Sequence, residues 1–298
     1  MNMTALGKRL LPAALALALV PVAVAPGFAA PVADPALSHA AGSVYLAPHR
    51  AIYDLSLVNA HGSRSIDGVA GRILYDFSGN VCEGYTLDFR QVSDMESSEG
   101  RSVVSDMRSL TWEGGKARSF RFSTTNNLND QRATHVAGNA ARGEKAVRVR
   151  LNKPARHSFS VPADAVFPTE HVARIIAAAR AGKSILSFPV YDGSDTGLKI
   201  YDTVTVIGKE IPPGAQPPHD AAAKVPALAK LARWPVTIGY FERESAAKQQ
   251  THEQTPTYAI SFELYENGIS RALLLYYSDF TLAGKMTALT LKTPKPCK

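Results

Sequence analysis

From His49 onward, apolar and polar residues alternate along most of the chain, and this period of two constrains the fold more than any other feature. In the first such segment Tyr53 and Leu55 share one face, while Asp54 and Ser56 share the other. The same pattern recurs at 69–77, 147–151 and 258–264. A strand of this kind has one face on a core and one face in water, which is typical of antiparallel sheets.

Turn signals between these segments indicate that consecutive strands are neighbours. Asn267-Gly268 is the strongest hairpin signal, and it predicts a turn whose two central residues both have positive φ. Gly114-Gly115 and Ala283-Gly284 predict two more turns. Further strand candidates are the ranges 85–92, 102–111, 119–123, 185–190, 199–207, 236–242, 272–281 and 287–291. Together these signals predict a mainly β protein with an antiparallel meander.

One segment changes period and predicts an amphipathic helix at about 168–182. Its apolar residues follow the i, i+3, i+4, i+7 spacing of a helix face, at Val172, Ile175, Ile176 and Ala179. Pro168 suits the first turn and Gly182 suits the end. A single helix of this kind in a β protein covers one face or one mouth of a curved sheet.

The N-terminus has the three parts of a secretory signal peptide. Residues 1–9 are basic, residues 10–24 are apolar, and small residues follow at Gly27 and Ala29. A membrane anchor is the alternative, but two prolines interrupt the apolar run, which is shorter than the ~20 residues that span a bilayer. We therefore expect export to the periplasm with cleavage after Ala29, and no membrane-spanning segment in the mature chain.

The rest of the chain is expected to be one domain. Residues 30–43 mix Pro, Ala, Asp and Gly without a period and predict a flexible leader after the signal peptide 1–29. The single domain then covers 44–298. Within it, the range 209–230 is rich in Pro and Ala and predicts a long surface loop with at most one or two helical turns.

The two cysteines, Cys82 and Cys297, lie 215 residues apart and make one candidate disulfide in an oxidising compartment. Closing a loop of this length stabilises a fold by up to about 5 kcal/mol in the chain-entropy model. A redox or metal site is the alternative, but neither cysteine has a C-x-x-C partner. The structural bridge is favoured.

No catalytic or cofactor motif is readable. The chain contains no G-x-G-x-x-G, phosphate loop, H-E-x-x-H or G-x-S-x-G motif, and its eight histidines are scattered. We expect no cofactor and no metal. The most site-like segment is 191–197, where Asp192 and Asp195 lie on a Gly-rich stretch. Calcium would suit these oxygens, but the same residues make ordinary turns, and a turn is favoured.

A cluster of basic residues raises the question of nucleic-acid binding. Phe120 and Phe122 lie among the arginines Arg118, Arg121, Arg142, Arg148, Arg150 and Arg156. An exported protein seldom meets nucleic acid, so we expect none. A solvated strand face is the first interpretation, and an anionic envelope surface or an acidic partner is the second.

Several segments in a fixed order resemble one family. They are LAPHRAIYDL at 46–55, VCEGY at 81–85, FPTEH at 167–171, YDGSD at 191–195 and FELYENG at 262–268, with a cysteine at the extreme C-terminus. In this combination the chain resembles the EipB-like family of periplasmic cell-envelope proteins of alphaproteobacteria. The resemblance implies a β-spiral, an incomplete barrel with a helix at its core or mouth, similar in shape to lipoprotein carriers. It also implies the Cys82–Cys297 disulfide, a role in envelope integrity and no known catalytic reaction.

These observations predict a non-catalytic periplasmic protein that supports the envelope by binding an apolar ligand, a lipoprotein segment or a protein partner. The resemblance makes a tetratricopeptide-repeat protein one candidate partner. The candidate residues of the concave face are Tyr53, Leu55, Ile73, Tyr75, Phe120, Phe122, Ile260 and Phe262, with plain core as the alternative for each. Two other functions stay open: an envelope hydrolase built from His171, Asp192 and Asp195, and a structural scaffold with a filled interior.

Overall fold

The computed structural model describes residues 44–60, 66–97, 99–243, 255–294 and 296–297. The expected signal peptide at 1–29 and the leader at 30–43 lie outside the described residues. Within the described part, no helix has the length and apolar character needed to cross a bilayer.

Fourteen strands form one antiparallel sheet, as the alternation predicted. Its order is β8-β7-β6-β5-β4-β3-β2-β1-β14-β13-β12-β11-β10-β9, so the two chain halves meet where β1 pairs with β14. The strands are β1 His49–Ala60, β2 Ile66–Asn80, β3 Gly84–Ser97, β4 Ser102–Glu113, β5 Ser119–Leu128, β6 Gln131–Arg142, β7 Ala146–Lys153, β8 His157–Pro162, β9 Ile185–Val190, β10 Tyr201–Ile207, β11 Arg233–Glu242, β12 Tyr258–Tyr265, β13 Ser270–Tyr276 and β14 Phe280–Leu291.

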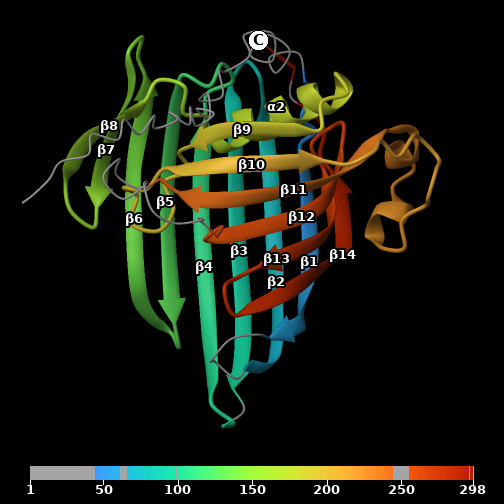
Figure 1. Ribbon diagram of the computed structural model, residues 1–298, viewed down its shortest axis with the longest axis horizontal. Coiled ribbons are helices and arrows are strands. Elements are labelled where there is room, and N and C mark those ends of the chain that lie inside the picture. The colour runs from blue at the N-terminus through green and yellow to red at the C-terminus, as the bar shows by residue number, and fades with distance from the viewer. Residues whose placement is uncertain (1–43, 61–65, 98, 244–254, 295, 298) are drawn as a thin grey trace, which may run out of the picture. The chain divides into compact units, whose positions relative to one another are not determined.

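The sheet curls over itself into an incomplete barrel, which confirms the predicted architecture. Figure 1 shows β9–β13 passing across the front of β1–β5, so the two halves become two facing layers. Strands β8 and β9 are the free edges of the sheet. Near them a single parallel bridge between Val166 and Val190 spans the seam.

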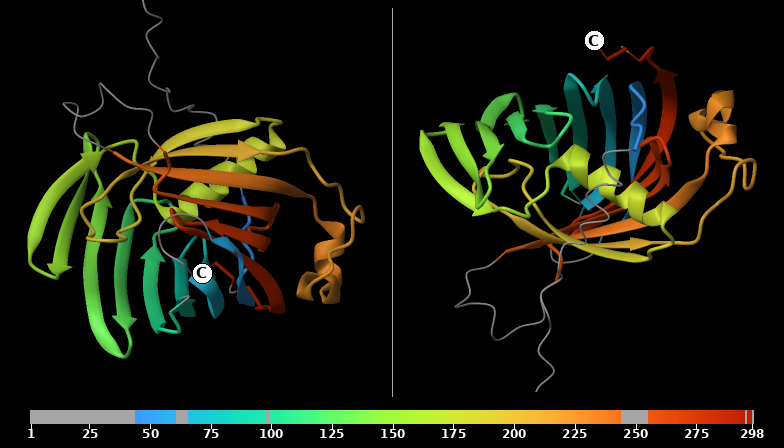
Figure 2. Two further views of the ribbon diagram at one scale, coloured as in Figure 1. Left: turned by 60° about the horizontal axis from the view of Figure 1, so that its bottom comes forward. Right: turned by 90° about the horizontal axis from the view of Figure 1, so that it is seen from above.

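Helix α2, Pro168–Arg180, follows β8 and lies between the two layers (Figure 2). It confirms the predicted helix, and its first turn contains Pro168 as expected. The chain leaves the helix through Gly182, whose φ of +70° is a conformation that favours glycine. Most of the helix is buried, with Ile175, Ile176 and Ala178 fully enclosed.

Several strand and turn predictions were wrong or incomplete. Strands β6 and β8 were not predicted. In β6 the buried residues are Val136, Gly138 and Ala140, and this mostly small set gives a weak apolar signal. Ala283-Gly284 is not a turn but the interior of β14, where a Cβ on Gly284 would lie 3.0 Å from Leu273. The predicted strand 272–281 is instead divided by the turn between β13 and β14. At the turn after β12, only Gly268 has positive φ.

The Pro/Ala-rich range contains two short 3₁₀ helices, η1 Ala221–Lys224 and η2 Pro226–Lys230, as the prediction of at most two turns allowed. It is less of a surface loop than expected, because Ala222 and Leu228 are buried against β1, β13 and β14. Asp220 caps η1 through the backbone N–H of Ala222 at 3.0 Å.

The predicted disulfide joins Cys82, in the turn after β2, to Cys297 near the C-terminus. The last segment of the chain also forms an ion pair between Lys292 and Asp76, and the Lys292 backbone N–H donates to Pro48. The bridge therefore fastens the end of the chain to the β2–β3 hairpin.

Three apolar clusters fill most of the interior. The first packs α2 against β9, β11 and β12, and the second joins β1, β2, β13, β14 and the two 3₁₀ helices. The third lies under β5–β8 and contains Phe120, Phe122, Phe167 and Tyr191. Space remains between these clusters, and that space holds the candidate site.

Candidate ligand-binding cavity

Three adjoining cavities lie between the two layers of the curled sheet. The main cavity has a volume of about 620 Å³ and lies between β3–β5 and β10–β14. A second cavity of about 180 Å³ shares Phe89, Gln91 and Tyr258 with it. A third of about 90 Å³ reaches helix α2 and shares His49 and Tyr75 with the second. The three therefore follow one another from the interior of the sheet to the helix.

One wall of the main cavity is a continuous row of aromatic rings. We call Tyr201, Tyr240, Tyr258, Tyr277 and Phe280 the aromatic row. Neighbouring ring centroids in it are 6.2, 5.9, 5.2 and 4.7 Å apart, which is contact distance for aromatic side chains. The sheet register produces the row, since Tyr240 on β11 lies directly opposite Tyr258 on β12.

Burial keeps the hydroxyls of the aromatic row neutral, because the low-dielectric interior disfavours a phenolate. It raises the pKa of Tyr240 and raises the pKa of Tyr258 well above 10.0. The row thus presents apolar ring faces with uncharged hydroxyls to the cavity.

The opposite wall is made by β3, β4 and β5 and combines flexible apolar groups with small polar ones. Met95 and Met107 line it together with Ser93, Ser105 and Asn126. The Ser105 hydroxyl donates to the Asn126 side chain at 3.1 Å, so these polar groups have partners. Methionine adapts its shape to a contact surface and interacts well with aromatic rings. The cavity therefore has one rigid wall and one adaptable wall.

Five of the eight predicted concave-face residues line the second cavity. Tyr53, Ile73, Tyr75, Ile260 and Phe262 come from β1, β2 and β12 and face one another across the two layers. The Tyr53 hydroxyl donates to the Ser270 carbonyl at 2.7 Å. Burial raises the pKa of Tyr75 to about 12, so its hydroxyl stays protonated.

The other three predicted residues lie elsewhere in the interior. Leu55 is buried in the second apolar cluster and lines none of the three cavities. Phe120 and Phe122 are buried in the third cluster, where Phe120 stacks on Phe167 at 5.2 Å and Phe122 meets the edge of Tyr191 at 5.9 Å. Phe167, just before helix α2, and Tyr191, at the start of the 191–197 segment, thus fill the space in front of these two rings.

The 191–197 segment forms the polar end of the main cavity. The Asp192 carboxylate accepts the Ser194 backbone N–H at 2.9 Å, which is the turn geometry that the sequence favoured. Burial raises the pKa of Asp192, and the nearby Asp195 carboxylate adds to this effect. Asp195 pairs with Lys199 at 2.5 Å, and Lys199 also pairs with Glu242 at 2.9 Å.

The residues considered for a hydrolase are not brought together. Asp192 and Asp195 line the main cavity, but His171 lies on α2 with its ring edge-on to Phe188 at 6.1 Å and lines none of the three cavities. Burial, with a smaller effect of Arg174, lowers the pKa of His171 to about 4. Among the described residues, no group of three or more His, Cys, Asp or Glu side chains is placed to hold a metal ion.

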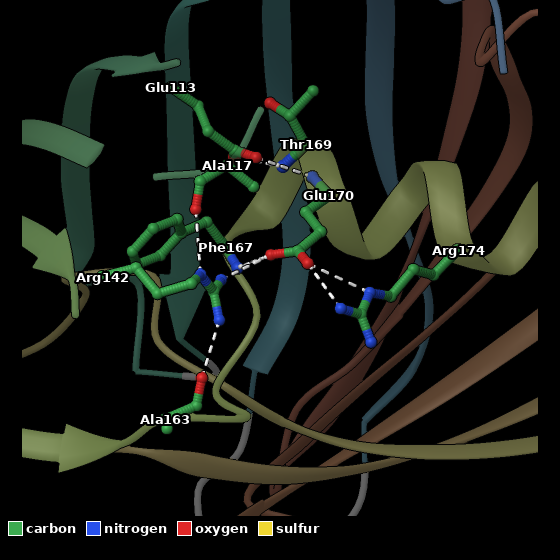
Figure 3. A network of polar contacts seen from close by, with 8 residues as sticks. All are labelled: Glu113, Ala117, Arg142, Ala163, Phe167, Thr169, Glu170 and Arg174. Atoms are coloured by element: carbon green, nitrogen blue, oxygen red, sulfur yellow. Dashed lines mark hydrogen bonds and ion pairs between the residues drawn. The ribbon is translucent and has the colours of Figure 1, made fainter. Parts of the chain in front are cut away.

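A polar network fixes the helix that closes the third cavity (Figure 3). The Glu113 carboxyl on β4 accepts the backbone N–H groups of Thr169 and Glu170 at 2.7 and 2.8 Å, so a distant strand caps the helix. Phe167, at the N-cap, has no polar side chain for this purpose. Burial raises the pKa of Glu113 to about 8, although the two backbone hydrogen bonds oppose this shift.

Glu170 continues the network toward β6. Its carboxylate pairs with Arg142 at 2.7 Å and with Arg174 at 2.6 Å. Arg142 also donates to the carbonyls of Ala117 and Ala163 and lies 5.0 Å from the Phe167 ring. The helix is therefore held to the inner side of β4–β6 by charged groups that are largely buried.

The sequence did not identify the aromatic row or the two methionines. Tyr258 shares a face with the predicted residues Ile260 and Phe262, so extending that alternation by one step would have found it. Tyr201 lies on β10, Tyr240 on the neighbouring β11 and Tyr277 in the turn between β13 and β14, and only the register of the sheet brings them together.

The comparisons with known proteins agree with this fold. The EipB-like family model matches residues 40–293. A curated relative, cell envelope integrity protein EipB of Brucella abortus (strain 2308), is 34% identical over 252 residues, covering 85% of this chain and 86% of the relative.

A solved structure is similar as well. The crystal structure of a beta-barrel-like protein of the domain of unknown function DUF1849 from Brucella abortus superposes with a TM-score of 0.76. The two sequences are 33% identical, and the match covers 84% of this chain and all of the other. With a family model that spans most of the sequence and a relative of this identity, the chain belongs to the EipB-like family.

Proposed function

We propose that this protein works in the periplasm and supports the integrity of the cell envelope by holding an apolar ligand, without catalysis. The observation that carries the proposal is the unfilled main cavity of about 620 Å³, lined by the aromatic row. The ligand class is a lipid acyl chain or the apolar segment of a lipoprotein.

The size and lining of the cavity support binding. The main cavity is partly open to solvent rather than an enclosed void, so a ligand can reach its apolar lining. Ligand pockets of about 300–1,000 Å³ are typical, and they are mostly apolar with a few placed polar groups. Here the polar groups gather at one end, at Asp192 and Ser194. This unfilled interior favours binding over the structural scaffold, for which a filled interior was expected.

The biological setting rests on the family and on the N-terminus. The relative named cell envelope integrity protein supports an envelope role for this chain. The expected signal peptide supports the periplasm as its site of action. A protein partner of the tetratricopeptide-repeat type remains an expectation from the family resemblance.

Binding can be tested with a neutral fluorescent probe of apolar sites, N-phenylnaphthylamine, and with a matched pair of variants on β4. Met107→Trp places a larger ring in the main cavity, whereas Val104→Trp adds the same ring on the exposed outer face of the same strand. We expect Met107→Trp to weaken probe binding by about tenfold, which corresponds to about 1.4 kcal/mol of lost contact. Val104→Trp should bind like the wild type.

The natural ligand requires a second measurement. Protein purified from its own periplasm and examined by native mass spectrometry should carry additional mass that Met107→Trp removes. Equal probe binding by both variants, together with protein that carries no lipid or peptide, would contradict the proposal. Complementation of an envelope defect in a strain lacking the gene then tests whether ligand binding and the envelope role depend on the same cavity.

A further inference from the structure

The positive charge of the chain is concentrated in one quarter of the sheet. Residues 116–162, which contain β5–β8, include ten Lys and Arg but only two Asp and Glu, a net charge of +8. The whole chain carries +7, so all other residues together carry −1. These strands are the green ones at the left of Figure 1.

The strand register gathers three of these arginines on the outer face of the sheet. Arg121 on β5 and Arg148 and Arg150 on β7 are exposed, while the residues alternating with them, such as Phe120 and Val149, are buried in the third cluster. We call these three arginines the basic face. Arg121 lies opposite Asn139 on β6, and Asn139 lies opposite Arg150. With strands about 4.8 Å apart, the Cα atoms of Arg121 and Arg150 are about 10 Å apart.

On the outer face of β1–β4 the arginines are paired with aspartates. There Arg72 pairs with Asp54 at 2.8 Å, and both Arg90 and Arg108 pair with Asp106 at 2.9 and 3.0 Å. Across the residues that the structure describes, no carboxylate forms an ion pair with the basic face. The outer face of β1–β4 thus neutralises these arginines with its own carboxylates, whereas the guanidinium groups of the basic face are available to an external anion.

The surroundings of the basic face favour a bilayer over an acidic polypeptide. The Arg121 guanidinium lies 4.2 Å from the centre of the Trp112 ring, and Leu110, two residues earlier on β4, is 54% exposed. Arginine beside tryptophan and an exposed leucine is the combination that suits the headgroup layer of a membrane. The residues between the arginines are small, including Ala141 and Ser160, so a broad surface can approach them.

We propose that the basic face docks the protein peripherally on a bilayer that contains anionic phospholipid. The three guanidinium groups would bind lipid phosphates, which match the planar donor geometry of arginine. Leu110 and Trp112 would enter the headgroup layer. Docking of this kind does not require the cavity to hold a ligand.

Co-sedimentation with vesicles tests the proposal. The wild type should bind vesicles of phosphatidylcholine containing one third phosphatidylglycerol at about 50 mM salt, and should be released at about 500 mM. It should not bind vesicles of phosphatidylcholine alone. The variant R121Q/R148Q/R150Q should bind about 100-fold more weakly, since each basic residue contributes about fivefold near an anionic surface.

A matched control separates the face from net charge. The variant R50Q/R72Q/R108Q removes the same charge from the outer face of β1–β4 and should bind nearly as well as the wild type. All substituted side chains are exposed, and circular dichroism should show that both variants fold. Equal loss by both triple variants, equal binding to vesicles without phosphatidylglycerol, or binding of polyglutamate but not of anionic vesicles would overturn the proposal.

Tryptophan emission gives a second readout. The chain has two tryptophans, and Trp234 is buried, so Trp112 is the one that can meet lipid. In a Trp234→Phe background, anionic vesicles should shift the emission of Trp112 to shorter wavelength. Emission that does not change on vesicle binding would remove Leu110 and Trp112 from the docking surface and overturn this orientation.

Discussion

At the residue scale, burial shifts the pKa values of two side chains toward their neutral forms, His171 on helix α2 and Glu113 beside it. His171 is 3% exposed, and its Nε2 has no hydrogen-bond partner in the described residues. Glu113 is equally buried, but its carboxyl receives two backbone N–H groups. The histidine is therefore held neutral without a polar contact at Nε2, while the glutamate supplies hydrogen bonds that the helix needs.

The buried His171 predicts a loss of stability in mild acid. Its pKa falls from 6.5 in the unfolded chain to about 4 in the fold, so the unfolded state binds a proton first as the pH drops. The stability that this group contributes is present above pH 6.5 and is lost progressively between about 6.5 and 4. The slope for one group is at most about 1.4 kcal/mol per pH unit.

We expect His171→Phe to change the slope of the free energy of unfolding against pH in this window by up to about 1.4 kcal/mol per pH unit relative to the wild type, as measured by urea denaturation at several pH values. The comparison is made with the wild type because Glu113, whose pKa burial raises to about 8, contributes a slope of the opposite sign between about pH 4.5 and 8. Part of the dependence should remain, because burial also lowers the pKa of His49. His157→Phe, at an exposed position, serves as the control and should follow the wild type. An unchanged slope in His171→Phe would show that His171 titrates normally in the fold.

Gly193 gives a second residue-scale prediction. Its φ is +68°, and a Cβ at this position would lie 2.5 Å from the Phe122 ring. Gly193→Ala should therefore lower the free energy of unfolding by about 2–4 kcal/mol, from backbone strain and overpacking together.

Gly214 is the matched control, since its φ of +76° is similar but no atom lies within 4 Å of the added Cβ. Gly214→Ala should cost only about 1–2 kcal/mol from backbone strain. Equal losses in the two variants would mean that contact with Phe122 contributes nothing at Gly193.

At the scale of elements, α2 depends on a strand that is remote in sequence. It begins after Phe167, which cannot cap it, and Glu113 on β4 takes that role across 56 residues of chain. Glu170 then ties the first turn to β6 through Arg142. The position of the helix at the third cavity is therefore set by polar groups as well as by its apolar face.

We expect Glu113→Ala to lower the free energy of unfolding by about 2–3 kcal/mol, because two helix N–H groups lose their acceptor in a buried site. Glu113→Gln should lose about half as much, since its amide oxygen can still accept one of them. Chemical denaturation monitored by circular dichroism measures both. Glu144→Ala, in an exposed turn, should change stability by no more than about 0.5 kcal/mol. If Glu113→Ala lowered the free energy of unfolding by no more than about 0.5 kcal/mol, that result would contradict the capping role.

The sequence predicted those elements whose signal is local. Alternation over 258–264 and the helical spacing of Ile175 and Ile176 depend on neighbouring residues only, and both predictions were confirmed. Strand β6 was missed because Val136 is its only large buried residue, beside Gly138 and Ala140. Gly284 was misread because a close approach to Leu273 requires glycine in a strand. The aromatic row could not be predicted, since it depends on how separate hairpins pair in space.

At the scale of the whole molecule, the curled sheet is fastened at one point by a covalent bond. The disulfide links Cys82 to Cys297, which are 215 residues apart in sequence. The loop that it closes contains strands β3–β14. Such a long closed loop restricts the unfolded chain strongly. Removing the disulfide should therefore lower stability more than removing any single contact at the C-terminus.

We expect the double variant C82S/C297S to be less stable than the oxidised wild type by about 2–5 kcal/mol in urea denaturation. Reducing agent should lower the wild type to the same level and leave the double variant unchanged. Alkylation of the non-reduced periplasmic protein should label neither cysteine. Labelling of both cysteines in the native protein would show that the bridge is not formed there.

The seam between β8 and β9 has a mechanical consequence. In a closed barrel, every strand is paired on both sides, so the girth is fixed unless a complete ladder of hydrogen bonds breaks. Here the described residues near the seam join it through two backbone bonds, from Val166 to Pro189 and from Tyr191 to Val166, at 2.8 and 3.0 Å. Opening the seam therefore breaks two backbone hydrogen bonds and the apolar packing of Val166, Phe167 and Tyr191, but no complete ladder between strands.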